Sequence, residues 1–372
     1  MRLLGSTQIY SDVTPKAAAE GEEDMDMDDD ADYILELEAN CDGSLLAASL
    51  SSLGVSIHDA ATLAATSRLE GMHTSRINGI EFLRQHPHIL VSSSDDKRLR
   101  MWDLRAAAVG PVVDMRCREE VMDVSVGHGD ALLACAVGTS VLFYDVRNSS
   151  GTSSWASAAA QLGEYADAHT DTISQLRFHP CRDAEIATAS EDGLICTFNT
   201  RAAEGSEAII SIMNTECPVR RFGFFGQEQE GLYCLSTVET ASFWHPVSAQ
   251  RINAHASLRE DFDLDYLVDC FYSAASGELL LLGGCHNGQG KVLSVTPAAV
   301  TQVGALKGGH GSTIRCVAGN AVGGGKFVTG GEDSRLCAWE AKATVRGPER
   351  ERPGGKSKGK GKSDKGHHHS PY

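Results

Sequence analysis

The sequence has no apolar segment of the length that crosses a membrane. The run LLLLGG at residues 279–284 is far shorter than the roughly 20 apolar residues of a spanning helix. The first residues, MRLLGSTQIYSD, also lack the apolar core of a secretory signal. We therefore expect an intracellular protein that contacts no membrane and resides in the cytoplasm, the nucleus or both.

The sequence also lacks the spacings that mark metal sites and common catalytic sites. None of its eleven cysteines is spaced as CxxC, so we interpret them as small apolar core residues in a reducing compartment. The phosphate loop GxxxxGK[ST], the nucleophile elbow GxSxG and the zinc motif HExxH do not occur. We expect no enzyme, no cofactor and no functional metal, and the run HHH at 367–369 would bind a metal only adventitiously.

Negative charge is abundant but unevenly distributed. The net charge is −17, and residues 20–32 contain nine acids and no base. Residues 342–366 contain nine Lys or Arg against three acids, which leaves about −15 on residues 33–341. A body this acidic argues against a folded part that follows a phosphate backbone. Both charged ends have the composition of disordered segments.

One pattern occurs three times. The segments HTSRINGIEFLRQHPHILVSSSDDKRLRMWDLR (73–105), HTDTISQLRFHPCRDAEIATASEDGLICTF (169–198) and HGSTIRCVAGNAVGGGKFVTGGEDSRLCAWE (310–340) each begin with His. An Asp follows 23 positions later and an aromatic residue 29 positions later. A catalytic triad is needed once, so three copies at equal spacing indicate architecture.

The distances between the copies indicate a longer series of repeats. The first two histidines are 96 residues apart and the last two 141 residues apart, close to two and three units of about 47 residues. Each copy contains short β-rich runs bounded by Asp, Gly and Ser, and none has a helical pattern. Weaker copies fill the gaps at 44–60, 131–147, 231–246 and 278–295, which makes seven units.

These units resemble WD repeats, and seven of them imply an all-β, seven-bladed β-propeller. AHTDTISQLRFHP with SEDGL, then LDYLVDCFY, then GGHGSTIR with TGGEDSRLCAW resembles the WD repeat-containing protein 89 family. The resemblance covers roughly 33–341 and implies an interaction propeller without assigned chemistry. The predicted domains are an N-terminal segment 1–32 with the acidic run, the propeller 33–341 and a basic disordered tail 342–372.

In a propeller blade, strands a to d run from the central channel outward. We expect the leading His, in the d–a loop, to bridge the Asp of the b–c turn and a Ser two positions before it, with the Trp of strand c completing the chain. The third copy has Gly331 in place of that Ser, and the second has Phe198 in place of Trp. The predicted structural networks are His73, Ser94, Asp96 and Trp102; His169, Ser190 and Asp192; and His310, Asp333 and Trp339.

The outer strand of the last blade has two candidate donors. One is RLLGSTQIY at 2–10, and the other is the segment 341–346. Either would close the ring and remove an open sheet edge.

We predict a non-enzymatic scaffold that docks proteins or peptides on the face formed by the d–a loops and b–c turns. The segment LREDFDLDYLVDC at 258–270 alternates acids with apolar residues and suits a basic partner, unless its apolar side chains simply pack on the ring. The candidate contact residues are Arg76, Lys97, Asp171, Glu191, Glu332, Phe262, Asp263 and Asp265. We expect a monomeric ring within a larger assembly.

Two alternatives remain open. In the first, the protein is a nuclear or ribonucleoprotein assembly component, and the tail anchors weakly to RNA or another anionic partner. In the second, an enzyme is built at the channel mouth, which an unrepeated His or carboxylate with a strongly shifted pKa would support.

Overall fold

The computed structural model describes residues 1–9, 32–71, 73–106, 110–147, 160–166, 168–202, 205–273, 276–319 and 325–340. These residues all belong to one compact unit, Met1–Lys342. The predicted tail and all of the acidic run except Asp32 lie outside the described residues. The predicted domain boundaries stay predictions.

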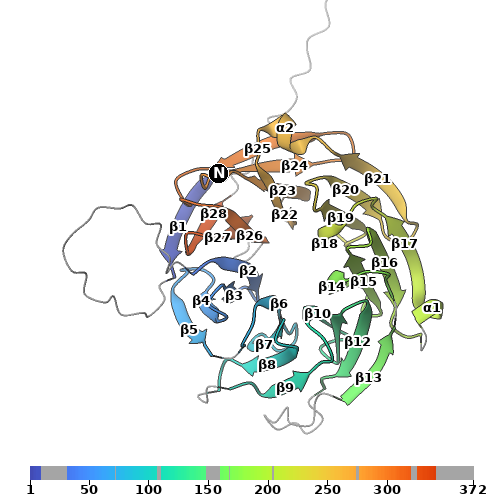
Figure 1. The fold of residues 1–372 in the computed structure, drawn as a ribbon. Coiled ribbons are helices and arrows are strands. Elements are labelled where there is room, and N and C mark those ends of the chain that lie inside the picture. The colour runs from blue at the N-terminus through green and yellow to red at the C-terminus, as the bar shows by residue number, and fades with distance from the viewer. Residues whose placement is uncertain are drawn as a thin grey trace, which may run out of the picture. The chain divides into compact units, whose positions relative to one another are not determined.

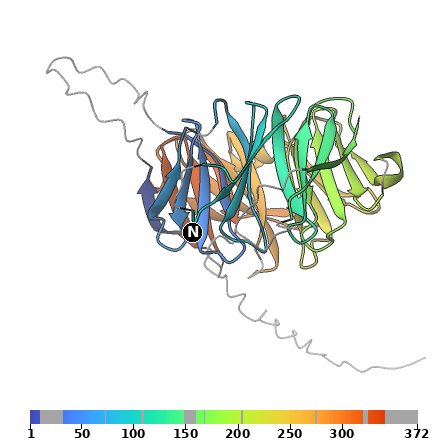
Figure 2. The ribbon, with the colours of Figure 1, turned by 90° about the horizontal axis from the view of Figure 1, so that it is seen from below.

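The described strands form seven four-stranded antiparallel sheets, arranged as blades around a central channel (Figure 1). In the edge-on view of Figure 2 the blades stand side by side, with loops gathered at the two rims. This confirms the all-β, seven-bladed propeller, and each of the seven sequence units contributes to one blade.

Strand a of each blade lines the channel, and strands b and c follow outward. The a strands are β2 (Ile34–Ala39), β6 (Ile77–Phe82), β10 (Val121–Gly127), β14 (Ile173–Phe178), β18 (Val219–Phe225), β22 (Tyr266–Ser273) and β26 (Ile314–Gly319). The b strands are β3 (Leu45–Leu50), β7 (Ile89–Ser94), β11 (Leu132–Val137), β15 (Glu185–Ser190), β19 (Gly231–Ser236), β23 (Glu278–Gly284) and β27 (Lys326–Gly331). The c strands are β4 (Val55–Asp59), β8 (Arg98–Asp103), β12 (Ser140–Asp145), β16 (Leu194–Asn199), β20 (Ala241–His245), β24 (Gly290–Val295) and β28 (Arg335–Glu340).

Strand d forms the outer edge of each blade. The d strands are β5 (Ala65–Leu69), β9 (Val113–Arg116), β13 (Ala160–Tyr165), β17 (Ile209–Asn214), β21 (Gln250–His255), β25 (Val300–Leu306) and β1 (Arg2–Gln8). Of two short helices, α1 (Gly205–Ala208) lies in the connection between β16 and β17 within blade 4, and α2 (Leu258–Phe262) lies in the connection between blades 5 and 6.

The N-terminal segment supplies the outer strand of the last blade. Strand β1 pairs antiparallel with β28, from Arg2 opposite Glu340 to Gln8 opposite Arg335. Of the two candidate donors, it is therefore the segment at 2–10 that pairs with β28. The first and last parts of the chain are joined in one sheet, which covers the edge that β28 would otherwise expose.

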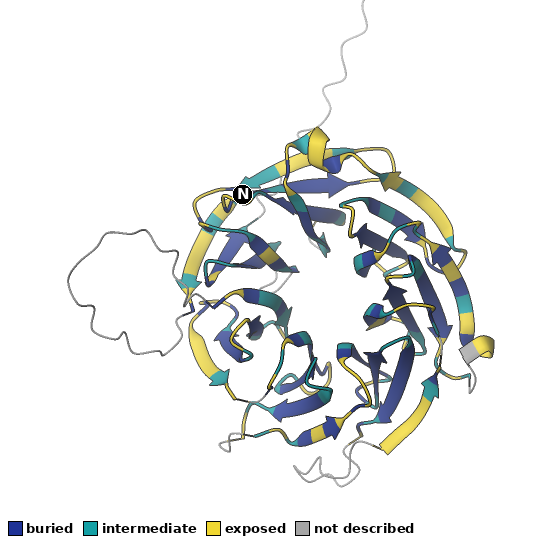
Figure 3. Cartoon of the chain, in the orientation of Figure 1, coloured by how far each residue is buried: buried dark blue, intermediate teal, exposed yellow. Residues whose placement is uncertain are grey.

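Burial is greatest in the middle strands of each blade (Figure 3). Strands b and c consist mostly of buried residues, whereas d strands such as β5 and β13 are largely exposed. Apolar clusters fill the spaces between successive blades. One of them contains Met101 of β8 in blade 2 together with Val124 of β10 and Leu142 of β12 in blade 3. Strand c has runs of consecutive buried residues, as in β4 and β8, because each blade packs against two neighbours.

In every blade the pairing between strands a and b has a register irregularity. It lies directly after the first or second residue of strand a. Examples are the shifts between Ile77 and Gly79 and between Val121 and Asp123. Such a bulge twists the strand locally and redirects the following side chains. At Gly79 this brings the next blade very close, because a Cβ atom there would lie 2.5 Å from Asp123 Oδ1.

Candidate functional site

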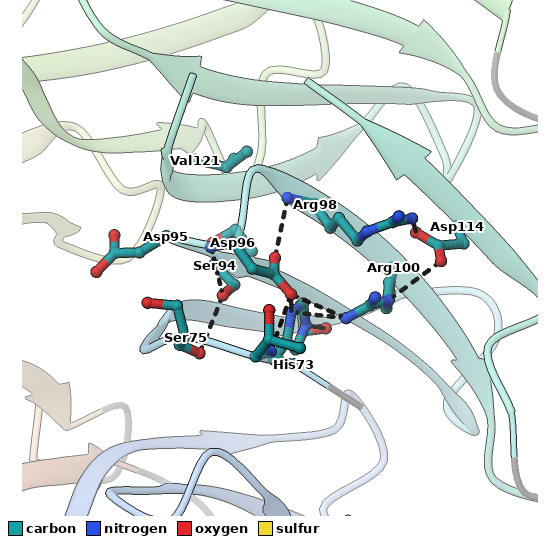
Figure 4. Close-up of polar contacts among 12 residues, drawn as sticks. His73, Ser75, Ser94, Asp95, Asp96, Arg98, Arg100, Asp114 and Val121 are labelled. Atoms are coloured by element: carbon teal, nitrogen blue, oxygen red, sulfur yellow. Dashed lines mark hydrogen bonds and ion pairs between the residues drawn. The ribbon is translucent and has the colours of Figure 1, made fainter. Parts of the chain in front are cut away.

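The first His–Asp pair lies within blade 2 and is shown in Figure 4. His73 Nδ1 lies 3.0 Å from Asp96 Oδ2, and His73 Nε2 lies 2.8 Å from Ser92 Oγ. Trp102 Nε1 donates to the same Ser92 oxygen at 2.9 Å. Arg100 extends the network, because its Nη1 donates to Asp96 Oδ2 at 3.2 Å.

Blades 4 and 7 repeat this geometry. The Nδ1 atoms of His169 and His310 lie 3.0 Å from carboxylate oxygens of Asp192 and Asp333. On the other ring edge, the two Nε2 atoms meet threonine hydroxyls, Thr188 at 2.7 Å and Thr329 at 2.8 Å. Trp339 Nε1 also donates to Thr329 at 2.8 Å, whereas Phe198 has no donor to offer.

The predicted serine partners were wrong. The hydroxyl that meets each imidazole belongs to Ser92, Thr188 or Thr329, four positions before the Asp and not two. Side chains alternate between the faces of a strand, but both positions share a face, so spacing alone did not separate them. The structure separates them because Nε2 points down the blade, away from the turn.

Ser94 and Ser190 form different hydrogen bonds from those predicted. Each hydroxyl accepts from the backbone N–H of the Asp, at 3.1 Å, and donates to the carbonyl of a d–a loop residue, Ser75 or Asp171. In blade 7 this position is Gly331, where a Cβ atom would lie 2.8 Å from Thr313 O. The two serines therefore tie the turn to the loop without touching the imidazole.

Burial and hydrogen bonding shift the pKa values of these paired residues in opposite directions. Burial lowers the pKa of His73 and of His169, because desolvation disfavours the charged ring. Burial alone would raise the pKa of Asp96, but the hydrogen bonds from His73 and Thr74 N and the nearby positive charge of Arg100 together outweigh burial and lower that pKa. Each of the three imidazoles is hydrogen-bonded on both ring edges within its own blade.

The d–a loops and b–c turns lie on one face, which we call the d–a face. Backbone bonds join them in blade after blade, such as Asp95 N to Arg76 O, Glu191 N to Thr172 O and Glu332 N to Thr313 O. These bonds and the His–Asp pairs hold the loops against the turns. The face is therefore a fixed surface in the described part of the ring.

Five of the candidate contact residues lie in these loops and turns. Arg76, Asp171 and Glu191 are exposed, whereas Lys97 and Glu332 are half-buried. Glu332 forms an ion pair with Arg315 at the channel mouth, through Arg315 Nε at 2.8 Å. The structure places these residues on the predicted face, and their role as partner contacts stays a prediction.

The segment 258–270 packs largely on the ring. Leu258 and Leu264 are buried, and Phe262 packs against the same apolar cluster. Asp263 is fully exposed in a left-handed conformation at the end of α2, and exposed Asp265 accepts a bond from His286 N at 2.8 Å. The alternation of acids and apolar residues thus separates an inward apolar side from an outward acidic side.

The channel holds charged residues that the sequence analysis did not nominate. A cavity of about 890 Å³ is lined by residues from all seven a strands, among them Glu38, Glu81, Asp123, Arg177 and Arg221. Desolvation raises the pKa of Glu38 to about 8 and that of Asp123 to about 7. The same carboxylates hold the pKa of Arg177 above its usual value, against the opposing effect of burial. The sequence analysis did not find this set, because its members lie on different a strands and are acids in some blades and arginines in others.

Two of these carboxylates accept hydrogen bonds from the backbone of an adjacent blade. Asp123 accepts from Leu176 N in the next blade at 3.0 Å, and Glu81 accepts from Val126 N at 3.2 Å. Both bonds cross a blade interface. They oppose the desolvation that raises the pKa of these two carboxyl groups, so burial in the channel is the cause of the shifts.

The remaining sequence expectations concern cysteines, metals and membranes. All eleven cysteines are free thiols, and seven of them are buried, which agrees with their interpretation as core residues. Among the described residues no group of His, Cys, Asp and Glu is arranged to hold a metal, and the histidine run lies outside these residues. No helix in the described ranges is long and apolar enough to span a membrane.

Comparison with known proteins matches this architecture. Residues 66–103, 161–199 and 301–340 match the WD40 family, described as WD domain, G-beta repeat, and they contain the three His–Asp pairs. Over 318 residues the chain is 30% identical to the WD repeat-containing protein 89 homolog of Dictyostelium discoideum, covering 84% of this chain and 83% of that protein. It is also 30% identical over 334 residues to the WD repeat-containing protein GTS1 of Arabidopsis thaliana, covering 84% and 82%.

Proteins built from WD repeats bind protein partners and generally act as interaction scaffolds, typically without catalysis. Identity at this level across four fifths of both chains goes beyond a shared fold. The chain belongs to the WD repeat-containing protein 89 family of WD-repeat β-propellers.

Proposed function

We propose that this protein is a non-enzymatic scaffold that docks partner proteins or peptides on the d–a face of a single ring. The observation that carries the proposal is the saturation of the three His–Asp pairs. Each imidazole bonds a carboxylate and a hydroxyl of its own blade, so these groups support the loops and are not available for chemistry. What the face offers to the outside is a fixed arrangement of loop residues.

The exposed acids of blade 4 are the first place to test the proposal. Asp171 and Glu191 lie on the d–a face, and neither forms an ion pair within the described residues. Reversing their charge with Asp171→Lys and Glu191→Lys should change which proteins a tagged chain captures, because the framework below them stays intact. The matched control reverses two exposed acids at the other rim, Asp183→Lys and Glu228→Lys.

The measurement is quantitative capture from native lysate, compared between the two double variants and the parent chain. We expect the d–a face variant to lose specific partners that the control retains. Equal capture by all three proteins, with unchanged melting temperatures, would contradict the proposed docking face.

A second candidate function rests on the tail. Residues 342–366 contain nine Lys or Arg against three acids, whereas the rest of the chain is acidic. In this alternative the protein is a component of a nuclear or ribonucleoprotein assembly, and the tail gives electrostatic anchoring while the ring selects the partner. Removal of residues 347–372 tests it, because only this candidate predicts that capture becomes insensitive to salt and that nuclear localisation is lost.

A further inference from the structure

A second, smaller cavity lies beside the channel mouth on the d–a face. Its volume is about 350 Å³, within the range of ligand pockets. It is lined by three leucines, one hydroxyl and two arginines: Leu35, Leu50, Leu53, Ser51, Arg76 and Arg315. These residues come from blades 1, 2 and 7. We call this cavity the leucine–arginine pocket.

Leu53 is an apolar residue at a left-handed turn position. Leu53 has φ of 67° in the b–c turn of blade 1, in the left-handed region that disfavours large side chains. The equivalent turn position is left-handed in other blades too, at Lys97, Gly193, Glu239, Gly288 and Ser334. The conformation therefore belongs to the turn, and only in blade 1, among these positions, does it present a large apolar side chain, which lies at the pocket.

The charged rim of the pocket is cationic. Arg76 is exposed and forms no ion pair or side-chain hydrogen bond with any described residue. Arg315 is paired with Glu332, but one carboxylate cannot occupy the five N–H donors of a guanidinium. No acid lines the pocket. A ligand that fits it combines an apolar side chain with a neighbouring carboxylate, because the floor is apolar and both rim charges are positive.

We propose that the leucine–arginine pocket binds an acidic peptide segment of a partner protein. One apolar side chain of that segment lies against Leu35 and Leu53, since Leu50 itself is fully buried, and flanking carboxylates pair with Arg76 and Arg315. The inference rests on the proposed docking function and names the chemistry of the partner at one place on the d–a face. The guanidiniums repel a basic segment at this position, although the acidic surface elsewhere on the ring can still attract one.

The overall charge of the protein sets a condition for the test. About −15 on residues 33–341 repels a long polyanion at a distance, but charges farther apart than about 8 Å are largely screened at physiological salt. A short probe therefore reports the pocket and not the whole surface. A suitable probe is a fluorescein-labelled peptide with one leucine between two aspartates, followed by fluorescence anisotropy on the full chain.

Two variants separate binding from folding. Arg76→Ala removes an unpartnered cation, and Leu53→Gly removes the apolar floor while relieving the left-handed strain. Both should weaken probe binding about 10-fold to 100-fold, and Leu53→Gly should keep or raise the melting temperature. Arg116→Ala, an exposed arginine on β9, and Ser334→Gly, at the equivalent left-handed turn position of blade 7, are the matched controls and should bind like the parent.

Three further arms complete the experiment. Peptides with asparagine in place of aspartate, or alanine in place of leucine, should bind weakly. A chain with residues 20–31 replaced by Gly and Ser should bind the probe at least as tightly as the parent. Tighter binding would also support the pocket, because it would show that the acids of residues 20–31 compete with the probe. A labelled oligouridine that binds through Arg76 while the peptide does not would overturn the proposal.

Absence of peptide binding, or equal binding by Arg76→Ala, Leu53→Gly and the parent, would also overturn it. Such a result leaves the proposed function standing if charge reversal at Asp171 and Glu191 still changes capture from lysate. If both experiments are negative, the docking function itself fails.

Discussion

Thr329 Oγ1 lies 2.8 Å from His310 Nε2, on the side of the imidazole opposite Asp333. The same oxygen accepts from Trp339 Nε1, so one buried hydroxyl joins two ring systems. We expect Thr329→Val to lower the free energy of unfolding by about 1–3 kcal/mol, because it leaves two buried polar groups without a partner. Chemical denaturation measures this loss. Thr301→Val, on the exposed strand β25, is the control and should change stability by less than about 0.5 kcal/mol.

The pair in blade 2 should be more sensitive than the pair in blade 4. Asp96 accepts from His73 and from Arg100, whose side chain is 10% exposed, whereas Asp192 has no arginine partner among the described residues. Both Asp96→Ala and Asp192→Ala should lower stability by about 1–3 kcal/mol, with the larger loss for Asp96→Ala. Paired denaturation curves test the order. A variant that melts like the parent but loses one specific reaction would contradict the structural role.

Removal of residues 1–9 should open the ring. These residues contain β1, whose backbone bonds to β28 cover the edge of blade 7, and Leu3 packs against the apolar cluster around Trp339. We expect a loss of about 3 kcal/mol or more and association through the exposed edge of β28. Light scattering and thermal melting measure both effects. Adding a peptide of residues 1–9 in trans should restore part of the stability, and no effect of the deletion would contradict the closure.

Glu38 should make stability depend on pH. Its folded-state pKa is raised to about 8 from 4.5, so the folded protein keeps a proton that the unfolded chain releases over this interval. The contribution of this protonated carboxyl group to folding stability is complete below pH 4.5 and is lost as the pH rises toward 8. Glu38→Gln remains neutral, so its melting temperature relative to the parent should be higher at pH 8 than at pH 5. Glu228→Gln, exposed at the rim, should show a constant difference, and the same constancy in Glu38→Gln would contradict the prediction.

His73 and His169 predict a loss of stability in acid. Burial holds their pKa values below 6.5, so the unfolded chain binds protons first as the pH falls below this value. The unfolded state then gains stability relative to the folded state. Melting temperatures between pH 7 and pH 5 should decrease less steeply in a His169→Gln variant than in the parent, although that variant is less stable throughout. An equal slope in both proteins would contradict this role.

The sequence by itself determined the blade count, the strand pattern and the His–Asp pairing. These follow from local repetition: each blade is one antiparallel meander, and Asp96, Asp192 and Asp333 all lie 23 positions after their His. The acidic outer side of residues 258–270 also followed from the sequence, because acids and apolar residues alternate within this one segment.

Tertiary structure decided the features that join distant segments. Ser92, Thr188 and Thr329 share a strand face with the residues two positions later, and only the direction of the imidazole selects them. The channel carboxylates and the leucine–arginine pocket combine residues from different blades, as Leu53 and Arg315 do. These residues meet only because closing the ring brings their blades together.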